Sequence, residues 1–372
     1  MRMLQLVPAL NLTAHLGRGV QRIAADAVVG AVRSLPRQVS DIDAAYLTKL
    51  MQTYVSSVEV VGGDAGTSSR ALLKLGGTYV PETVFLKMAA ETRATRLMGE
   101  LGRLGRTEVQ FYRDLAPHLD DVPRCYGSAF DSLTGRFVLI LEDLATGGPC
   151  EFPDTLHPLT VDQGALIVEL LARVHATLWG KAGNYPWVYS ASGDSTSLLT
   201  GSLANTSVKK LARRTDIPVE NGRFIINNYR AAAALIDQAP GTIMHGDAHP
   251  GNVYFRNGKA GLLDWQAVRK GHPGRELSYT LITSMTTEDR RTHQRELLET
   301  YCRALFAAGG PNLDRNELWR RYRQGATYAY IATLITAGMG GMQNDTIAFE
   351  GLARSVAALD DLDTVEQLRG SM

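Results

Sequence analysis

The chain of 372 residues has few cysteines and no marked excess of charge of either sign. Its three cysteines, Cys125, Cys150 and Cys302, are odd in number and far apart in the sequence. Neither a disulfide framework nor a C-x-x-C metal site is therefore expected, and a reducing compartment, the cytoplasm, is favoured. The net charge of +1 argues against a surface that binds nucleic acid.

Long apolar segments are also missing from the sequence. No apolar run reaches the ~18–20 residues that a transmembrane helix needs, so no membrane span is expected. Residues 1–25 contain Arg2, Arg18 and Arg22 but no acidic residue, a feature of transit peptides. They lack a compact apolar region followed by a clear cleavage site. We therefore expect an N-terminal helix that covers the first lobe rather than a cleaved segment.

The most informative stretch runs from residue 243 to residue 266, I-M-H-G-D-A-H-P-G-N-V-Y-F-R-N-G-K-A-G-L-L-D-W-Q. Its polar residues follow a fixed spacing. Asp247 stands two residues after His245, and Asn252 stands five residues after Asp247. Asp264 follows Asn252 by twelve residues. Apolar residues lie before and between these positions, which indicates a loop followed by short strands.

A short hairpin is expected after the loop, with its turn at Asn257-Gly258. Such a hairpin returns Asp264 to the side of Asn252, while Asp247 projects from the loop nearby. The side-chain oxygens of Asn252 and Asp264 would then bind the same hard cation. Oxygen ligands are those that Mg²⁺ prefers. This arrangement resembles the one that protein-kinase-like enzymes use for phosphoryl transfer.

The run His-Gly-Asp-x-x-x-x-Asn at residues 245–252, followed by Asp-Trp, resembles the aminoglycoside phosphotransferase and choline kinase superfamily. These are small-molecule kinases built on the protein-kinase fold. The resemblance implies that Asp247 is the catalytic base and that Asn252 and Asp264 are the Mg²⁺ ligands. The ending Asp-Trp-Gln is similar to that of the ecdysteroid-kinase-like branch.

One lysine, Lys87, interrupts the apolar strand expected at residues 83–88. A lysine in such a strand is costly to bury without an anionic partner. The resemblance implies that Lys87 binds the α- and β-phosphates of ATP and is held by a glutamate on the next helix. Glu108, in E-x-x-F-Y-x-x-L, is the expected partner; Glu91 and Glu100 are alternatives.

A glycine-rich turn is expected at residues 62–69, between strands at 55–61 and 70–75. Glycines let backbone N–H groups approach phosphate oxygens, although an ordinary hairpin has a similar sequence. The candidate nucleotide-binding residues of this turn are Gly66, Thr67, Ser68 and Ser69.

A strand at residues 136–141 ends in Glu142-Asp143-Leu144. Similar kinases carry Leu-Glu-Asp-Leu at the hinge between the lobes, where backbone groups bind adenine. The resemblance therefore implies that Glu142 and Leu144 contact the nucleotide. Surface carboxylates at the end of a strand are the alternative interpretation of Glu142 and Asp143.

Together these features predict an α+β, bilobal protein-kinase-like fold. Residues 1–34 form an N-terminal extension of unknown purpose. Residues 35–144 form a nucleotide-binding lobe with an antiparallel sheet and a helix. Residues 145–372 form a mostly helical lobe with the catalytic loop and the acceptor pocket.

Three further residues of the second lobe have expected structural roles. His175, in a helix expected at residues 161–179, resembles a buried histidine of the superfamily and is expected to make hydrogen bonds in the core. His245 is expected to hold the catalytic loop. Glu276 stands where the superfamily usually has Asp and is expected to brace the same loop.

The predicted reaction is transfer of the γ-phosphate from Mg·ATP to a hydroxyl group of a small molecule. Too few residues separate Trp265 from Gly271 for the activation segment with which a protein kinase docks a polypeptide. Aminoglycosides, sugars, amino alcohols and sterol-like alcohols all remain open as acceptors. Acidic residues at 345, 350 and 360–363 would attract a cationic acceptor, although solvated surface is their default interpretation.

Two other functions are compatible with the sequence. A nucleotide-binding pseudokinase would keep the fold without turnover, although such proteins usually lose one of the lysine, aspartate and asparagine residues found here. A metallohydrolase would use His245, Asp247 and His249 as an H-x-D-x-H cluster for Zn²⁺. That alternative leaves the spacing to Asn252 and Asp264 unexplained.

Overall fold

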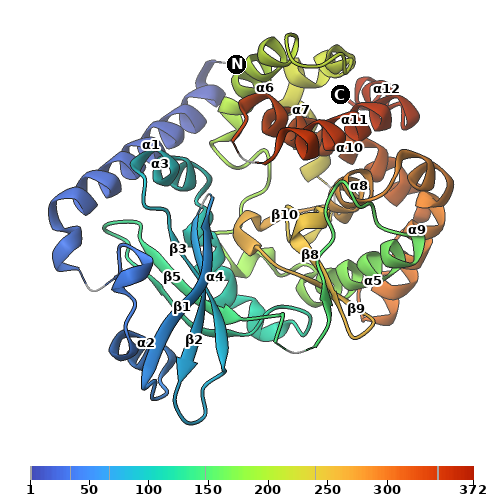
Figure 1. Ribbon diagram of the computed structural model, residues 1–372. Helices are drawn as coiled ribbons and strands as arrows, with labels where there is room; N and C mark the ends of the chain where they lie inside the picture. The colour runs from blue at the N-terminus through green and yellow to red at the C-terminus, as the bar shows by residue number, and fades with distance from the viewer. Residues whose placement is uncertain (1, 34, 67, 147, 239, 342) are drawn as a thin grey trace. The chain divides into compact units, whose positions relative to one another are not determined.

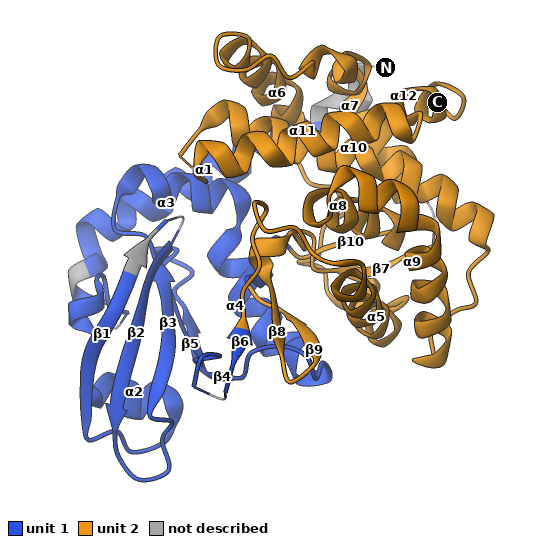
Figure 2. Ribbon diagram, turned by 45° about the vertical axis from the view of Figure 1, so that its right-hand side comes forward, with its two compact units in different colours: residues 1–150, 264–267 blue, residues 151–263, 268–372 orange. Residues whose placement is uncertain are grey.

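The structure is a computed structural model that describes residues 2–33, 35–66, 68–146, 148–238, 240–341 and 343–372. The chain divides into two compact units (Figure 2). Unit 1 comprises residues 1–150 together with 264–267, and unit 2 comprises residues 151–263 and 268–372. The predicted α+β class is confirmed, because an antiparallel sheet dominates unit 1 and helices dominate unit 2.

Unit 1 contains five strands and four α-helices among its described residues. The strands are β1 (Ser57–Ala65), β2 (Ser68–Gly76), β3 (Thr83–Ala89), β4 (Cys125–Phe130) and β5 (Phe137–Glu142). The helices are α1 (Arg2–Val29), α2 (Ala44–Met51), α3 (Arg93–Gly102) and α4 (Leu104–Asp114). The strands β1 and β2 continue further than predicted, so that Gly66 and Thr67 alone separate them, and Thr67 lies outside the described residues.

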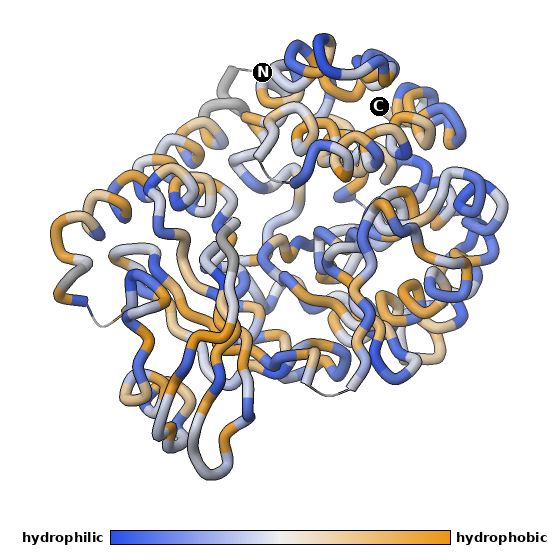
Figure 3. Tube along the Cα trace, viewed as in Figure 1, coloured by the Kyte–Doolittle hydropathy of each residue, from blue (hydrophilic) through white to orange (hydrophobic). Residues whose placement is uncertain are grey.

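The sheet of unit 1 has the order β1-β2-β3-β5-β4, and all of its neighbouring strands are antiparallel (Figure 1). Leu73, Leu86 and Ile140 are fully buried in a cluster with Leu47 of α2. Figure 3 shows hydrophobic stretches along these strands. Because successive side chains of a strand point to opposite faces, Lys87 lies on the face opposite Leu86, away from this apolar cluster.

The N-terminal helix α1 is fixed to unit 1 by a buried ion cluster. Asp26 accepts hydrogen bonds from Arg96 of α3 and from Arg136, the residue before β5, both at 2.5 Å. All three side chains are at least nine-tenths buried. Burial by itself would raise the pKa of Asp26, but the two guanidinium groups outweigh it and hold that pKa below its usual value.

Two further ion pairs bind the same segment to unit 1. Arg33 makes a bidentate pair with Asp131 at 3.0 Å, and Arg22 lies 2.7 Å from Glu100. The alternative pairing of Glu100 with Lys87 is therefore wrong. The segment predicted as an extension of unknown purpose is a structural part of unit 1.

Unit 2 contains eight α-helices among its described residues, and short strand pairs lie between them. The helices are α5 (Val161–Leu178), α6 (Ser197–Leu211), α7 (Arg223–Asp237), α8 (Pro273–Ser284), α9 (Thr287–Ala307), α10 (Arg315–Met339), α11 (Asp345–Asp361) and α12 (Thr364–Arg369). Strand β7 (Thr242–Met244) pairs with β10 (Arg269–Gly271), β8 (Val253–Arg256) pairs with β9 (Lys259–Leu262), and β6 (Cys150–Glu151) lies where the units meet along the chain.

Two helices of unit 2 are weakly marked in the sequence. Helix α6 spans 15 residues in a polar part of the chain. Its face with Ala204, Val208 and Leu211 is buried, whereas threonine, serine and asparagine between these positions obscure the apolar pattern. Helix α8 was not predicted, and all of its residues are buried, so it has no exposed polar face.

Helices α8 and α10 cross closely at two glycines. A Cβ atom added to Gly325 of α10 would lie 2.7 Å from the carbonyl oxygen of Gly274 of α8. A Cβ atom added to Gly274 would lie 2.9 Å from the backbone of Arg321. Small residues are therefore required at this crossing, and the crossing brings the two backbones together.

The three cysteines are free, as the sequence predicted. Within the described ranges, no helix has both the length and the apolar character that a membrane span requires.

We expect Asp26→Ala to lower the free energy of unfolding by ~3–5 kcal/mol, because Arg96 and Arg136 would be left buried without their carboxylate. Urea denaturation measures this change. The control is Arg113→Ala, which breaks an exposed pair with Asp114 and should cost at most ~1 kcal/mol. Equal effects of the two substitutions would contradict the structural role of Asp26.

A second stability prediction concerns His272, the N-cap of α8, whose Nδ1 accepts a hydrogen bond from Gly274 N at 3.1 Å. Burial, assisted by the charge of Arg321, lowers the pKa of His272 from 6.5 to about 4. The neutral ring therefore contributes stability that is complete above pH 6.5 and lost as the pH falls through about 4, in all ~3 kcal/mol. His272→Asn keeps a capping group, so its unfolding free energy should fall less between these pH values than that of the wild type.

Candidate active site

A buried lysine forms the centre of the candidate site in unit 1. The Nζ atom of Lys87 donates a hydrogen bond to Asp264 Oδ1 at 2.8 Å. The same atom lies 2.7 Å from Glu108 Oε2, in a second buried ion pair. The structure thus brings together three of the predicted site residues, and the expected partner Glu108 is present.

The electrostatics of this cluster follow from its burial. Lys87 is 4% exposed and Glu108 is 1% exposed. Burial alone would lower the pKa of Lys87, but the carboxylates of Asp264 and Glu108 outweigh it and raise that pKa. Burial raises the pKa of Glu108 more than the positive charge of Lys87 lowers it. The ammonium group is accordingly held in its charged form.

One face of α4 carries both Glu108 and Phe111. Glu108 and Phe111 are three residues apart and therefore lie on the same side of the helix. The ring of Phe111 stacks on that of Trp265, with centroids 4.0 Å apart and planes at 5°. Asp264, directly before Trp265, has a left-handed backbone with φ of +63°, which few residues other than glycine adopt. These contacts explain why residues 264–267 belong to unit 1.

The glycine-rich turn differs in part from its prediction. Gly66 N donates to Ser68 O at 2.9 Å, but Ser68 and Ser69 are buried residues of β2 rather than turn residues. Thr67, the remaining candidate, lies outside the described residues. Their role in nucleotide binding stays a prediction.

Arg70 is a basic residue near this turn that sequence reasoning missed. It lies directly opposite Lys87 in the pairing of β2 with β3, so both side chains project from the same face of the sheet. A Cβ atom on Gly66 would lie 3.1 Å from Arg70 Nη2. The signal that could have found Arg70 was the register of the two strands.

The predicted hinge follows β5. Glu142 N donates to Arg124 O at 2.8 Å, and Glu142 Oε2 accepts from Arg124 N at 3.2 Å. The neighbouring Asp143 accepts a hydrogen bond from the Thr83 hydroxyl at 2.6 Å. Leu144 is buried. Contact of Glu142 and Leu144 with a nucleotide stays a prediction.

In unit 2, the loop after β7 carries Asp247 and is held at its start by His245. The ring of His245 accepts a hydrogen bond from Asp247 N at its Nδ1 atom and donates from Nε2 to Leu263 O. His245 is fully buried. Its predicted role of holding the loop is confirmed.

Glu276 of α8 holds the backbone of the same loop. It accepts hydrogen bonds from His245 N at 3.2 Å and from Gly246 N at 2.5 Å, and His175 Nε2 lies 2.8 Å from its Oε2 atom. Burial alone would raise the pKa of Glu276, but the hydrogen bond and charge of His175 and the other donors lower it. The expected bracing role is confirmed, and so is the buried, hydrogen-bonded position of His175.

Asn252 has a fixed orientation at the end of the loop. Its Nδ2 donates to Asp247 O at 2.9 Å, and its backbone carbonyl accepts a hydrogen bond from Leu263 N at 3.0 Å. Because Nδ2 is the donor, Oδ1 is the amide atom of Asn252 that can bind a cation. The hairpin that follows turns at Asn257 and Gly258, both with positive φ as a type I′ turn requires.

Two tyrosines that were not assigned to the site contact the loop. The hydroxyl of Tyr279, on α8, donates to Asp247 Oδ1 at 2.8 Å. The hydroxyl of Tyr328, on α10, donates to Gly246 O at 2.7 Å. The position of Tyr279, three residues after Glu276, was the available sequence signal, but α8 itself was not predicted.

The geometry does not support the metallohydrolase. Both ring nitrogens of His245 are used in hydrogen bonds, and His249 Nδ1 accepts from Gly251 N. Among the residues that the structure describes, no group of three histidine, cysteine or acidic side chains is arranged to hold a metal ion.

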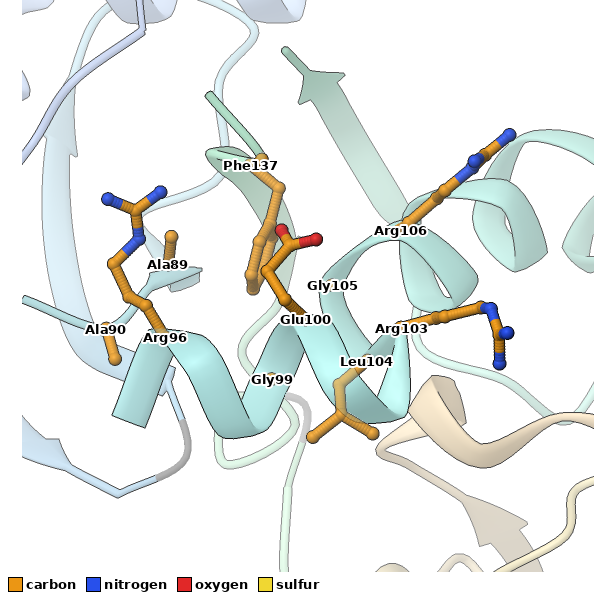
Figure 4. A pocket seen from close by; sticks show the side chains of 11 residues that line it. Ala89, Ala90, Arg96, Gly99, Glu100, Arg103, Leu104, Gly105, Arg106 and Phe137 are labelled. Atoms are coloured by element: carbon orange, nitrogen blue, oxygen red, sulfur yellow. The ribbon is translucent and has the colours of Figure 1, made fainter. Parts of the chain in front are cut away.

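A small open pocket lies elsewhere in unit 1, between α3, the start of α4 and the start of β5 (Figure 4). Figure 4 shows Glu100 beside the Phe137 ring, whereas Arg103 and Arg106 point away from it. Arg96 and Glu100, which line the pocket, are already paired with Asp26 and Arg22. None of the predicted site residues lines this pocket, so it is not a candidate active site.

Comparison with known proteins places this geometry in context. Residues 59–323 match the model of the phosphotransferase enzyme family called APH. A solved structure from Ralstonia eutropha JMP134, described as a candidate aminoglycoside phosphotransferase, is similar with a TM-score of 0.56 and 16% identity over 88% of this chain and 98% of that one. A spectinomycin phosphotransferase in complex with ADP and spectinomycin is similar with a TM-score of 0.50 and 13% identity over 90% of this chain and 100% of that one. No curated protein sequence matches the chain significantly.

Proposed function

Because the chain belongs to the phosphotransferase enzyme family, we propose that it is an ATP- and magnesium-dependent kinase that transfers the γ-phosphate to a hydroxyl group of a small molecule. The observation that carries this proposal is the buried ammonium group of Lys87 beside Glu108 and Asp264. Buried charges of this kind usually stabilise a fold less than apolar residues would. A phosphate-binding role accounts for keeping them.

In this proposal residues 35–144 bind the nucleotide. Lys87, oriented by Glu108, donates to the α- and β-phosphates, and backbone N–H groups of the turn with Gly66, Thr67, Ser68 and Ser69 approach the phosphate oxygens. Backbone groups of Glu142 and Leu144 bind adenine. Asp264, which accepts a hydrogen bond from Lys87, would be one of the residues that hold magnesium.

Residues 145–372 supply the acceptor side of the reaction. Asp247 accepts the proton of the acceptor hydroxyl as its oxygen bonds to the γ-phosphorus, and the bond from that phosphorus to the β-γ bridging oxygen breaks. The products are a phosphoester and ADP. The hydrogen bonds from Tyr279 and Asn252 hold Asp247 for this step.

The chemistry of two side chains fits magnesium. Asn252 offers an amide oxygen and Asp264 a carboxylate, the hard oxygen ligands that this ion prefers. When bound, magnesium neutralises the charge that develops on the phosphate oxygens.

The acceptor is proposed to be a small alcohol of the aminoglycoside-like, sugar, amino-alcohol or sterol-like classes. Arginines pair with acidic residues of the last helices. These acidic residues therefore do not favour a polycationic acceptor over the other classes. Asp345 lies 2.7 Å from Arg214, and Glu350 lies 2.9 Å from Arg354. The enzyme is assigned to the cytoplasm, since its free cysteines suit a reducing compartment.

We expect Asp247→Ala to lower the rate of phosphate transfer by ~10²–10⁴-fold, because it removes the general base. The measurement is ADP release with Mg·ATP across a panel of the four acceptor classes. Nucleotide affinity, measured by calorimetry, should stay unchanged. Full activity of this variant would contradict the mechanism, and ADP release by neither protein with any acceptor would favour the pseudokinase.

Asp264→Ala should instead weaken Mg·ATP binding itself, raising the dissociation constant by about tenfold or more, equivalent to ~1.4 kcal/mol. Glu82→Ala, at an exposed carboxylate of unit 1, is the control and should leave the affinity unchanged. The effect should shrink when EDTA removes magnesium from both proteins. An unchanged affinity in Asp264→Ala would count against its role as a metal ligand.

A further inference from the structure

Arg275, in the first turn of α8, is buried without a carboxylate partner. Its side chain is 5% exposed. The Nη1 atom has no hydrogen-bond partner, and no carboxylate of the described residues lies within ion-pair distance of the guanidinium group. A guanidinium group always carries its charge and has five N–H donors. Burying it without an anion is therefore costly.

The other buried arginines show that this state is unusual in the chain. Among the described residues, each of them pairs with a carboxylate. The pairs are Arg96 and Arg136 with Asp26, Arg290 with Asp361, Arg321 with Glu317, and Arg354 with Glu350. Arg275 alone departs from the way in which the described part of the fold compensates its buried arginines.

The surroundings of Arg275 do not replace the missing carboxylate. Its guanidinium group lies 3.9 Å from the centre of the Tyr328 ring, on the adjacent helix α10 (Figure 2). The face of an aromatic ring attracts a cation but offers no oxygen to its N–H groups. Arg275 also stands three residues after His272, the N-cap of α8. The start of a helix is partially positive, which disfavours a cation and favours an anion there.

Arg275 lies near the loop that carries the proposed catalytic base. A small pocket of unit 2 is lined by Met244, Gly246, Arg275, Glu276, Tyr279 and Tyr328. Tyr328 donates to Gly246 O, and Tyr279 donates to Asp247 Oδ1. Burial raises the pKa of Tyr328, the charge of Arg275 opposes this rise, and that of Asp247 adds to it. The charges of Arg275 and Asp247 thus act on the same hydroxyl group.

We propose that Arg275 binds an oxyanion group of the acceptor, so that the phosphorylated molecule is an alcohol that also carries a carboxylate or a phosphate. This inference rests on the proposed function and narrows its acceptor. The planar guanidinium group matches two oxygens of such an anion with parallel hydrogen bonds. The acceptor would supply the anion that the fold does not provide, and the bond would hold its hydroxyl group near Asp247.

The first test measures ADP release with Mg·ATP and two matched sets of acceptors. One set is glycerol, glycerate and glycerol 3-phosphate, and the other is glucose, glucuronate and glucose 6-phosphate. In at least one set, we expect the kcat/KM of the wild type to be about tenfold or more higher for an anionic member than for the neutral alcohol. The faster of the two anionic members identifies the oxyanion as a carboxylate or a phosphate.

The substitution Arg275→Met keeps a long apolar side chain and removes the charge. Its kcat/KM for the anionic acceptor should fall by about ten- to a hundredfold, because hydrogen bonds to a charged group are lost. The value for the neutral alcohol should change little. Arg275→Lys keeps the charge without the planar pair of donors and should retain part of the preference.

A second readout does not depend on turnover. The melting temperature is measured without nucleotide in sodium acetate and in sodium sulfate, each compared with sodium chloride at equal ionic strength. At least one of these anions should raise the melting temperature of the wild type more than that of Arg275→Met, because a ligand that binds the native state stabilises it. In sodium chloride, Arg275→Met should melt no lower than the wild type, since it removes a buried charge without breaking an ion pair.

The matched control is Arg354→Met. Arg354 is equally buried, but it pairs with Glu350 at 2.9 Å. Its removal breaks this pair and should lower the melting temperature. The response to acetate or sulfate and the preference for anionic acceptors should stay as in the wild type.

The proposal is overturned if acetate and sulfate affect the wild type and Arg275→Met equally. It is also overturned if Arg275→Met melts as far below the wild type as Arg354→Met, because the contact with Tyr328 would then account for the arginine. Equal kcat/KM values for neutral and anionic acceptors would refute the inference and leave the proposed function intact. A response to anions without ADP release from any acceptor would instead refute the proposed function, while supporting the anion site itself.

Discussion

The arrangement of unit 1 depends on the need to place one ammonium group inside the otherwise apolar strand β3. A lysine in a buried strand is tolerated only when carboxylates lie within bonding distance. Lys87 has two of them, Glu108 and Asp264. One comes from α4 and the other from a segment more than 150 residues further along the chain. The stacking of Phe111 on Trp265 holds that distant segment against α4, so apolar packing supports the placement of the charges.

In unit 2, hydrogen bonds hold the loop that carries Asp247. A loop that must present a carboxylate leaves several backbone groups without partners, and buried groups of that kind are costly. Glu276 accepts from two of these N–H groups, and the rings of His175 and His245 complete the network. The two tyrosines extend it to Gly246 and to the side chain of Asp247. The loop is therefore held both at its backbone and at the side chain of Asp247.

The sequence predicted two kinds of site residue. Some lie close together in the chain, and others are of a type that is rare in their secondary-structure element. The spacing from His245 to Asn252 predicted the loop, and Asn257-Gly258 predicted the hairpin turn. Lys87 was recognisable because a charge is rare in an apolar strand. Arg70 and Tyr279 were missed for the opposite reason: an arginine in a half-buried strand and a tyrosine in a helix are ordinary, and only strand register or helix packing shows what they face.

The sequence predicted the α+β class, the order of most elements and the candidate reactive groups, because periodicity and short motifs are local properties. The tertiary structure was needed to show that α8 is a helix and that α1 is fixed by Asp26 between two arginines. Each of these depends on groups separated by tens of residues or more. Their pairing follows from burial and charge in the folded chain, which leaves no periodic signal in the sequence.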